Sequence, residues 1–168
     1  MIIAIDGYDG SGKTTIALQI SKRINGTYVK SYNNDLGRVI WSLINDEEYE
    51  LASLIARTAC RKEAERYKDA PYVIFDRHWM TMFTLIPEEF LDSWFPLPFT
   101  VLIEAETQTI VERLNKRNEK VDTPFEVHLD QQQRFREVAE RHQVAVINTS
   151  SELADTSVNR IISLINGG

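Results

Sequence analysis

The sequence predicts a three-layer α/β fold in which a five-stranded parallel sheet is flanked by helices. Five short runs of apolar and β-branched residues alternate with longer, helix-like segments along the chain. Four of these runs are almost continuously apolar, which is typical of strands buried on both faces of a sheet. Strands separated by helices also favour parallel pairing through right-handed crossovers. The length of 168 residues fits a single domain, which we expect to span residues 1–168.

Turn and breaker residues bound the predicted elements. Pro71 precedes the third strand, and Asn25-Gly26 marks the C-terminal end of the first helix. Parallel sheets of this kind bind ligands at the carboxyl ends of their strands, so we searched those ends for functional residues. The predicted strands are residues 2–6, 27–30, 72–76, 99–105 and 144–148. The predicted helices are residues 13–24, 36–44, 47–68, 107–118, 126–142 and 151–165.

Composition and charge narrow the range of functions. The net charge of -6 gives no bulk attraction to a nucleic acid polymer, so any phosphate must be bound locally. The single cysteine, Cys60, cannot form an internal disulfide, which fits a reducing compartment. We find neither a secretory signal nor an apolar run near the roughly 18 residues of a membrane span. We therefore expect a cytoplasmic protein that binds neither nucleic acid polymers nor membranes.

The stretch GYDGSGKT, residues 7–14, matches the phosphate-loop (P-loop) motif G-x-x-x-x-G-K-[ST] between a strand and a helix. Its glycines let successive backbone N–H groups turn inward, and the helix that starts at Lys13 adds its positive dipole end. We expect Lys13 to neutralise the phosphates of ATP and Thr14 to bind Mg²⁺. The ordinary alternative is a tight turn with a solvated lysine. The motif favours a P-loop NTPase fold, with ATP phosphates bound by Gly7, Gly10, Ser11, Gly12, Lys13, Thr14 and Thr15.

A carboxylate and a guanidinium follow the third predicted strand, in the stretch YVIFDRHW. Asp76 is expected to hold Mg²⁺ opposite Thr14 and to take part in catalysis. Arg77 is expected to bind an anionic acceptor or the phosphoryl group in transfer. The alternative is a surface Asp-Arg pair that begins a loop.

These motifs resemble those of thymidylate kinases and the neighbouring deoxynucleoside kinases, and the resemblance extends over most of the chain. Asp9 stands at the acidic position of that family's phosphate loop, and Asp76-Arg77 matches its strand-3 motif. Arg57, in LASLIARTACRKE, falls within one position of a substrate-facing arginine, and Arg61 is the competing candidate. The resemblance implies a nucleoside monophosphate kinase-like fold with ATP and Mg²⁺. The family is often dimeric, which leaves a homodimer open.

The stretch VERLNKRNEKVDTPFE resembles the family's mobile lid, which we expect at about residues 113–126. A lid excludes water and brings arginines to the phosphoryl group in transfer. In the family this arginine comes from either the phosphate loop or the lid, and Gly10 leaves the role to the lid. Arg113 and Arg117, four positions apart on one helix, are the expected donors. The alternative is an ordinary solvated helix with charge pairing.

The acceptor side departs from the family. His78 replaces a tyrosine, Ser53 replaces a base-stacking phenylalanine, and the chain is shorter between Asp76 and the fourth strand. Trp79 is the favoured aromatic residue for stacking on a base, whereas His128 and His142 are expected to be solvated. The residues expected to bind the acceptor are Asp9, Arg57, Arg77, Asn33 and Asn34.

The sequence thus predicts an ATP- and Mg²⁺-dependent kinase of a nucleotide or nucleoside. The family's usual glutamate after the second strand is missing, which favours a monophosphate acceptor because a nucleoside needs a general base. The alternatives are a deoxynucleoside kinase, a kinase of another small metabolite and a GTPase-type module. A GTPase is disfavoured because Asp76 does not begin a D-x-x-G motif and no N-K-x-D motif occurs. The expected catalytic residues are Lys13, Asp76, Arg113 and Arg117.

Overall fold

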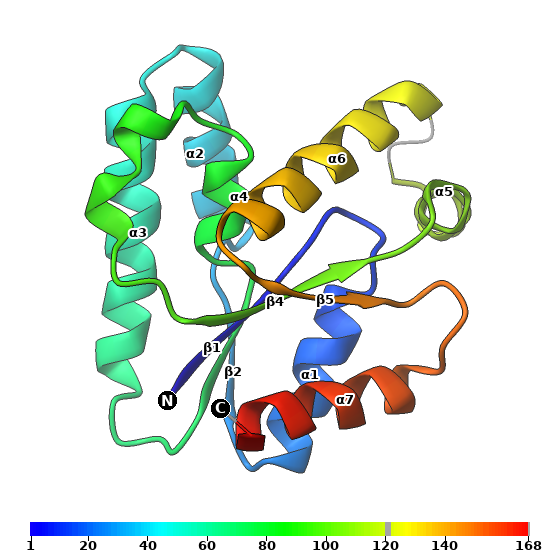
Figure 1. Ribbon diagram of the computed structural model, residues 1–168. Helices are drawn as coiled ribbons and strands as arrows, with labels where there is room; N and C mark the ends of the chain where they lie inside the picture. Colours follow the sequence, from blue (N-terminus) through cyan, green and yellow to red (C-terminus); the bar gives the residue numbers. More distant parts are fainter. Residues whose placement is uncertain (120–121, 168) are drawn as a thin grey trace.

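The computed structural model describes residues 1–119 and 122–167, and it contains the predicted parallel sheet (Figure 1). The strand order is β2-β3-β1-β4-β5, and every neighbouring pair is parallel. The prediction of a five-stranded parallel sheet is therefore confirmed, and no strand end moves by more than one residue. The strands are β1 (Ile2–Asp6), β2 (Thr27–Lys30), β3 (Val73–Asp76), β4 (Phe99–Glu104) and β5 (Ala145–Asn148).

The six predicted helices are present, and the 77–98 segment adds short elements that the sequence did not predict. These are α4 (Trp79–Phe83) and two 3₁₀ turns, Glu88–Phe90 and Asp92–Trp94. Helices this short contain too few residues to show an apolar periodicity. In the described residues, no helix has both the length and the apolar character needed to cross a membrane. The long helices are α1 (Lys13–Arg23), α2 (Asn34–Asn45), α3 (Tyr49–Arg66), α5 (Thr107–Lys116), α6 (Phe125–Arg141) and α7 (Ala154–Gly167).

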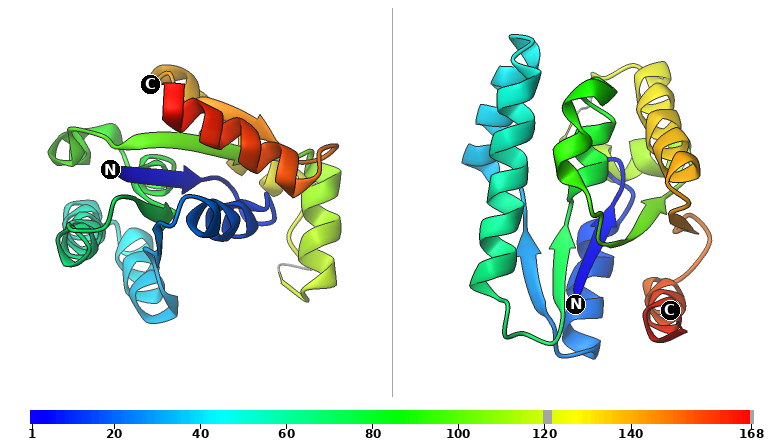
Figure 2. Two further views of the ribbon diagram at one scale, coloured as in Figure 1. Left: turned by 90° about the horizontal axis from the view of Figure 1, so that it is seen from below. Right: turned by 60° about the vertical axis from the view of Figure 1, so that its left-hand side comes forward.

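Two apolar clusters cover the two faces of the sheet and make the three layers (Figures 1 and 2). On one face, α1 and α7 pack through residues such as Ile16 and Ile161 against Ile3 and Ile5 of β1. On the other face, α2, α3, α4 and α6 pack against side chains such as Phe75 of β3. Strands covered on both faces explain the nearly continuous apolar runs in the sequence.

The sheet brings the two predicted phosphate-site motifs together. β1 and β3 are neighbours in the centre of the sheet, and Ile5 of β1 pairs with Asp76 of β3. The phosphate loop after β1 and the 76–78 segment after β3 therefore leave the sheet at the same edge. That edge is formed by the carboxyl ends of the strands, where parallel sheets bind their ligands.

Candidate active site

The phosphate loop wraps around the start of α1 because two glycines adopt conformations that other residues avoid. Gly7 has a φ of 150°, and a Cβ atom there would lie 2.1 Å from the carbonyl oxygen of Ile103. Gly12 is the N-cap of α1 with a φ of 95°. No side chain in the described part of the chain caps α1, so its first backbone N–H groups are available to an anion. The geometry of the loop fits a phosphate group.

Lys13 is held inside this loop. Its Nζ atom donates to the Tyr8 carbonyl at 3.3 Å and lies 3.5 Å from Oδ1 of Asp9. The residue is only 6% exposed. Burial, followed by the positive charge of Arg77, lowers the pKa of the Lys13 amine to about 8, against the opposing effect of nearby carboxylates. An anion bound in the loop would favour the protonated amine and raise this pKa.

Asp76 and Thr14 meet across the loop. The Thr14 hydroxyl donates to Oδ2 of Asp76 at 2.7 Å, and the Tyr28 hydroxyl donates to the same oxygen at 2.8 Å. The other carboxylate oxygen, Oδ1, is buried and has no hydrogen-bond partner among the described residues. A buried oxygen left in this state fits a hard divalent cation such as Mg²⁺, which prefers oxygen ligands. Mg²⁺ binding by Thr14 and Asp76 stays a prediction.

Arg77 faces Asp9 on the other side of the loop. Its Nη2 atom forms an ion pair and a short hydrogen bond with Oδ1 of Asp9, and its Nη1 atom donates to Thr81 Oγ1 at 3.3 Å. Arg77 has a φ of 70°, in the left-handed region that residues other than glycine seldom adopt. Strained backbone of this kind persists only where its surroundings hold it.

Asp6 provides that support, although the sequence analysis did not single it out. Its Oδ2 atom accepts the His78 backbone N–H at 2.8 Å, and its Oδ1 atom accepts the Thr81 hydroxyl at 2.7 Å. Asp6 is fully buried, and burial raises the pKa of its carboxyl group. A sequence signal was present, because Asp6 ends an apolar strand directly before Gly7 of the phosphate loop.

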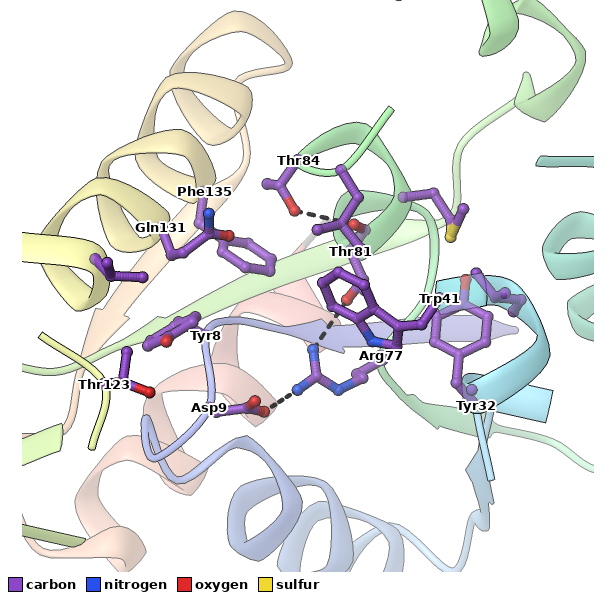
Figure 3. Close-up of a pocket in the computed structure, with 15 residues that line it drawn as sticks. Tyr8, Asp9, Tyr32, Trp41, Arg77, Thr81, Thr84, Thr123, Gln131 and Phe135 are labelled. Carbon is purple, nitrogen blue, oxygen red and sulfur yellow. Dashed lines mark hydrogen bonds and ion pairs between the residues drawn. The ribbon is translucent and has the colours of Figure 1, made fainter. Parts of the chain in front are cut away.

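A cavity of about 390 Å³ opens beside the Asp9–Arg77 pair, and we call it the Arg77 cavity (Figure 3). Figure 3 shows Trp41 on one side and Phe135 with Gln131 on the other. The lining residues come from the phosphate loop, α2, α4 and α6, and from the loops next to these helices. Apolar and aromatic walls with a few convergent polar groups are typical of small-molecule sites. The lining residues are Tyr8, Asp9, Tyr32, Gly37, Ile40, Trp41, Arg77, Thr81, Met82, Thr84, Leu85, Thr123, Val127, Gln131 and Phe135.

The aromatic residues differ from expectation. Trp79, the favoured stacking residue, is 1% exposed and its indole N–H donates to Thr100 Oγ1 at 2.8 Å, so it belongs to the core. Trp41 takes the expected position instead, since it is 51% exposed and lines the Arg77 cavity. The expectation that His128 is solvated was wrong. His128 is 1% exposed, and its Nδ1 atom lies 3.0 Å from the Tyr8 hydroxyl.

Arg57 and Asn33, two of the predicted acceptor residues, are not among those lining the Arg77 cavity. The Arg57 guanidinium donates from Nη1 to the Ser93 carbonyl at 3.0 Å and lines other cavities beside α3. The Asn33 side chain caps α2 by accepting the Leu36 N–H at 3.0 Å. Asn34 begins α2, and its side chain lies outside the described part of the structure. Asp9 and Arg77 are the predicted acceptor residues that the structure brings together.

The two predicted lid arginines have different surroundings. Arg113 lies in α5, and its Nη1 atom donates to the carbonyls of Gly10 at 3.1 Å and Ser11 at 3.2 Å. Its Nη2 atom donates to the Thr149 carbonyl at 2.9 Å, so Arg113 joins the phosphate loop to the segment after β5. Burial, together with the charge of Arg117, lowers the pKa of Arg113. Arg117 is exposed at the end of α5, and residues 120–121 of the predicted lid lie outside the described residues.

The remaining predicted loop residues, Gly10, Ser11 and Thr15, differ in how exposed they are. Gly10 has a φ of 80°, and Ser11 is fully buried with a hydroxyl that has no partner among the described residues. Thr15 is exposed in the first turn of α1. The sheet order, the loop around Lys13 and the Thr14–Asp76 contact together define a P-loop nucleotide-binding protein.

Comparison with known proteins identifies the family. A family model described as an AAA domain matches residues 3–132, and the chain belongs to that family. A Pyrococcus furiosus protein named "Putative adenylate kinase" is 26% identical over 175 residues, which cover 100% of this chain and 86% of the relative. A Methanococcus vannielii protein named "Probable thymidylate kinase" is 27% identical over 154 residues, which cover 82% of this chain and 77% of the relative.

The fold comparison agrees with these relatives. The solved structure of deoxyadenosine kinase from M. mycoides superposes with a TM-score of 0.67 at 19% identity, and it covers 100% of both chains. The predicted resemblance to thymidylate kinases and deoxynucleoside kinases is therefore confirmed at the level of family and fold. The chain is an enzyme, a kinase of the P-loop class.

Proposed function

We propose that this kinase transfers the terminal phosphoryl group of ATP to a nucleoside monophosphate bound in the Arg77 cavity. The observation that carries the proposal is the position of the Asp9–Arg77 pair, which lies between the phosphate loop and the cavity. A donor phosphate in the loop and an acceptor in the cavity would therefore approach each other at this pair. Such positioning, together with charge stabilisation, accounts for most of the catalysis of phosphoryl transfer.

On the donor side, the loop from Gly7 to Thr15 binds the phosphates of ATP and Lys13 neutralises them. Thr14 and Asp76 hold Mg²⁺, which fits the unpartnered Oδ1 atom of Asp76. When bound, Mg²⁺ neutralises negative charge on the phosphates. Arg117 is the lid candidate for approaching the phosphoryl group, because the Arg113 guanidinium already donates to loop carbonyls.

On the acceptor side, Arg77 binds the acceptor phosphate, and Asp9 orients Arg77 or contacts the acceptor sugar. Trp41 and Phe135 lie on opposite sides of the cavity and provide apolar surfaces for a base (Figure 3). Gln131 provides an amide that can donate and accept hydrogen bonds at the edge of the base. The relatives named for adenylate and thymidylate support a monophosphate acceptor.

A nucleoside acceptor is the second candidate, and the pairing of Arg77 with Asp9 favours it. A guanidinium already paired with a carboxylate attracts a doubly charged phosphate less strongly than an unpaired one does. The Asp9 carboxylate is also a suitable general base for a hydroxyl group beside the phosphate loop. The likeness to deoxyadenosine kinase is compatible with this second candidate.

The test is a panel of nucleosides and nucleoside monophosphates, each incubated with the protein, ATP and Mg²⁺. At least one monophosphate is expected to yield a diphosphate together with ADP. Lys13→Ala is expected to lower this activity by about a thousandfold or more, because the variant loses the charge that faces the phosphates. Lys22→Ala removes an exposed lysine from the same helix and is expected to keep wild-type activity.

Three outcomes distinguish the candidates. Product from nucleosides alone would replace the monophosphate with the second candidate. No product from the whole panel would contradict both. Hydrolysis of GTP that no acceptor accelerates would point to a GTPase-type module instead.

A further inference from the structure

A second cavity, of about 350 Å³, lies between α3 and the 94–98 segment. We call it the α3 cavity. It shares no lining residue with the Arg77 cavity. Its walls are mostly apolar and aromatic, and its lining residues include no carboxylate among the described ones. They include Arg57, Arg61, His78, Trp94 and the 95–98 segment.

Two arginines that line this cavity, Arg57 and Arg61, meet at the carbonyl of Ser93, a residue of the neighbouring cavity. Nη1 of Arg57 and Nη2 of Arg61 donate to the same carbonyl oxygen, that of Ser93, at 3.0 and 3.1 Å. Neither arginine forms an ion pair within the described residues, whereas Arg66 of the same helix pairs with Glu63. In an acidic chain, two neighbouring arginines without a carboxylate partner form a local binding site for an anion.

Arg57 also separates two cavities of opposite charge. On its other side lies a neighbouring cavity lined by Glu50, Glu89 and Asp92. An anion is repelled from that side and attracted to the α3 cavity, where the lining charges are those of Arg57 and Arg61. The charge distribution thus selects one of two adjacent cavities.

The inner wall of the α3 cavity provides aromatic rings and an unsatisfied polar group. His78 is 9% exposed, and its Nδ1 atom is buried without a hydrogen-bond partner among the described residues. Its ring lies edge-on to the rings of Phe75 and Trp94, with centroid distances of 5.0 and 5.8 Å. The buried Nε1 atom of Trp94 donates to Ser53 Oγ at 3.0 Å, which fixes the indole. A fixed indole presents a surface on which another ring can pack.

We propose that the α3 cavity is a second ligand site, which binds an aromatic phosphate monoester separately from the kinase substrates. The phosphate lies at Arg57 and Arg61, because two guanidinium groups match its double negative charge and its oxygen geometry. The aromatic ring lies against Trp94 and the 95–98 segment. A cavity of this volume is at the lower end of the range for small-molecule sites, which suits a ligand no larger than a nucleoside monophosphate.

The three tryptophans of the chain allow a direct test by titration with phenyl phosphate, followed by ¹H–¹⁵N NMR of the indole N–H groups. Trp94 reports on the α3 cavity, Trp41 on the Arg77 cavity and Trp79 on the core. Tryptophan-to-phenylalanine variants assign the signals. The Trp94 signal is expected to shift saturably, while the Trp79 signal stays in place.

Arg57→Gln/Arg61→Gln is expected to weaken the phenyl phosphate affinity measured at Trp94 by about tenfold or more. The matched control is Lys62→Gln/Arg66→Gln, which removes the same charge from exposed positions of α3 and is expected to keep the affinity. Arg61→Gln alone changes an exposed side chain and tests the same contact if the double variant does not fold.

Two results would overturn the proposal. One is a Trp94 signal that does not move while the Trp41 signal does, because the ligand then binds only in the Arg77 cavity. The other is an equal loss of affinity in the matched control, because the attraction then comes from the general charge of α3. Neither result bears on kinase activity, so failure of this site and failure of the proposed function are distinguishable.

Discussion

The phosphate loop and the Arg77 cavity lie next to each other, but they are built in different ways. The loop is one continuous segment whose shape is fixed by glycine conformations and by the start of α1. The cavity is assembled from the phosphate loop, from α2, α4 and α6 and from the loops next to these helices, which are far apart in the sequence. The loop presents mainly backbone N–H groups, whereas the cavity presents rings, an amide and an ion pair.

Because of this difference, substitutions in the phosphate loop and in the Arg77 cavity are expected to affect different steps of the reaction. A substitution on the metal and phosphate side removes a protein charge that acts on the reacting phosphoryl group. It therefore changes the stability of the transition state. A change in the cavity alters how well one acceptor fits, and therefore acts mainly on acceptor affinity. Substitutions on the two sides are expected to differ both in size and in the kinetic constant that they change.

After Lys13→Ala, the largest effect is expected from Asp76→Asn, which removes the negative charge beside Thr14. We expect kcat to fall by about a hundredfold to a thousandfold, with a larger requirement for Mg²⁺. Steady-state kinetics across a range of Mg²⁺ concentrations measure both changes. Tyr28→Phe is the milder control, because it deletes only one hydrogen bond to the same carboxylate. It is expected to lower kcat less than Asp76→Asn does. A kcat within tenfold of wild type in the Asp76 variant would argue against the metal role.

Arg77→Gln is expected to act on the acceptor. The variant keeps a polar side chain but loses the guanidinium group that can bind two phosphate oxygens. The KM for a monophosphate is therefore expected to rise by about tenfold to a hundredfold. The KM for ATP is expected to change much less. Initial-rate measurements with each substrate varied in turn separate the two constants. Arg66→Gln is the matched control, because that arginine lies at the end of α3 and pairs with Glu63. Equal effects on both KM values would remove the distinction between the two regions.

The pH dependence of ATP binding sharpens the description of the loop. The pKa of Lys13 is lowered to about 8 in the free protein, and the bound phosphates raise it by favouring the protonated form. ATP binding therefore takes up a proton above pH 8. The affinity is expected to fall as the pH rises, by at most about tenfold per pH unit. Calorimetry in buffers of different ionisation enthalpy measures the proton uptake, and Lys13→Gln is expected to abolish it.

The smallest effect is expected from Trp41→Leu in the Arg77 cavity. Because the indole is half exposed, its loss is expected to raise the acceptor KM by about threefold to tenfold and to leave kcat nearly unchanged. Val39→Ala alters another exposed apolar side chain of α2 that does not line the cavity. A similar rise in KM for both variants would show that α2 stability, rather than a ring contact, is responsible.

The contrast also explains which parts of the site were predictable from the sequence. The loop and Asp76 were found because their spacing and their place at strand ends are local properties. The positions of Trp41, Arg57 and His128 depend on which face of a helix meets the sheet and on how the helices pack. A single sequence shows which face of a helix is apolar but not which residues lie opposite that face, so Trp79 was expected at the site although it lies in the core.

The contacts of Arg113 have a mechanical consequence. Its guanidinium donates hydrogen bonds to the phosphate loop and to Thr149 after β5, so this part of α5 is attached to the loop. Any hinge for a closing movement must therefore lie beyond Arg113. If the predicted lid closes, such a hinge leaves Arg117, at the end of α5, on the side of the lid. The two arginines, one turn apart, would then serve as an anchor and as a mobile arm.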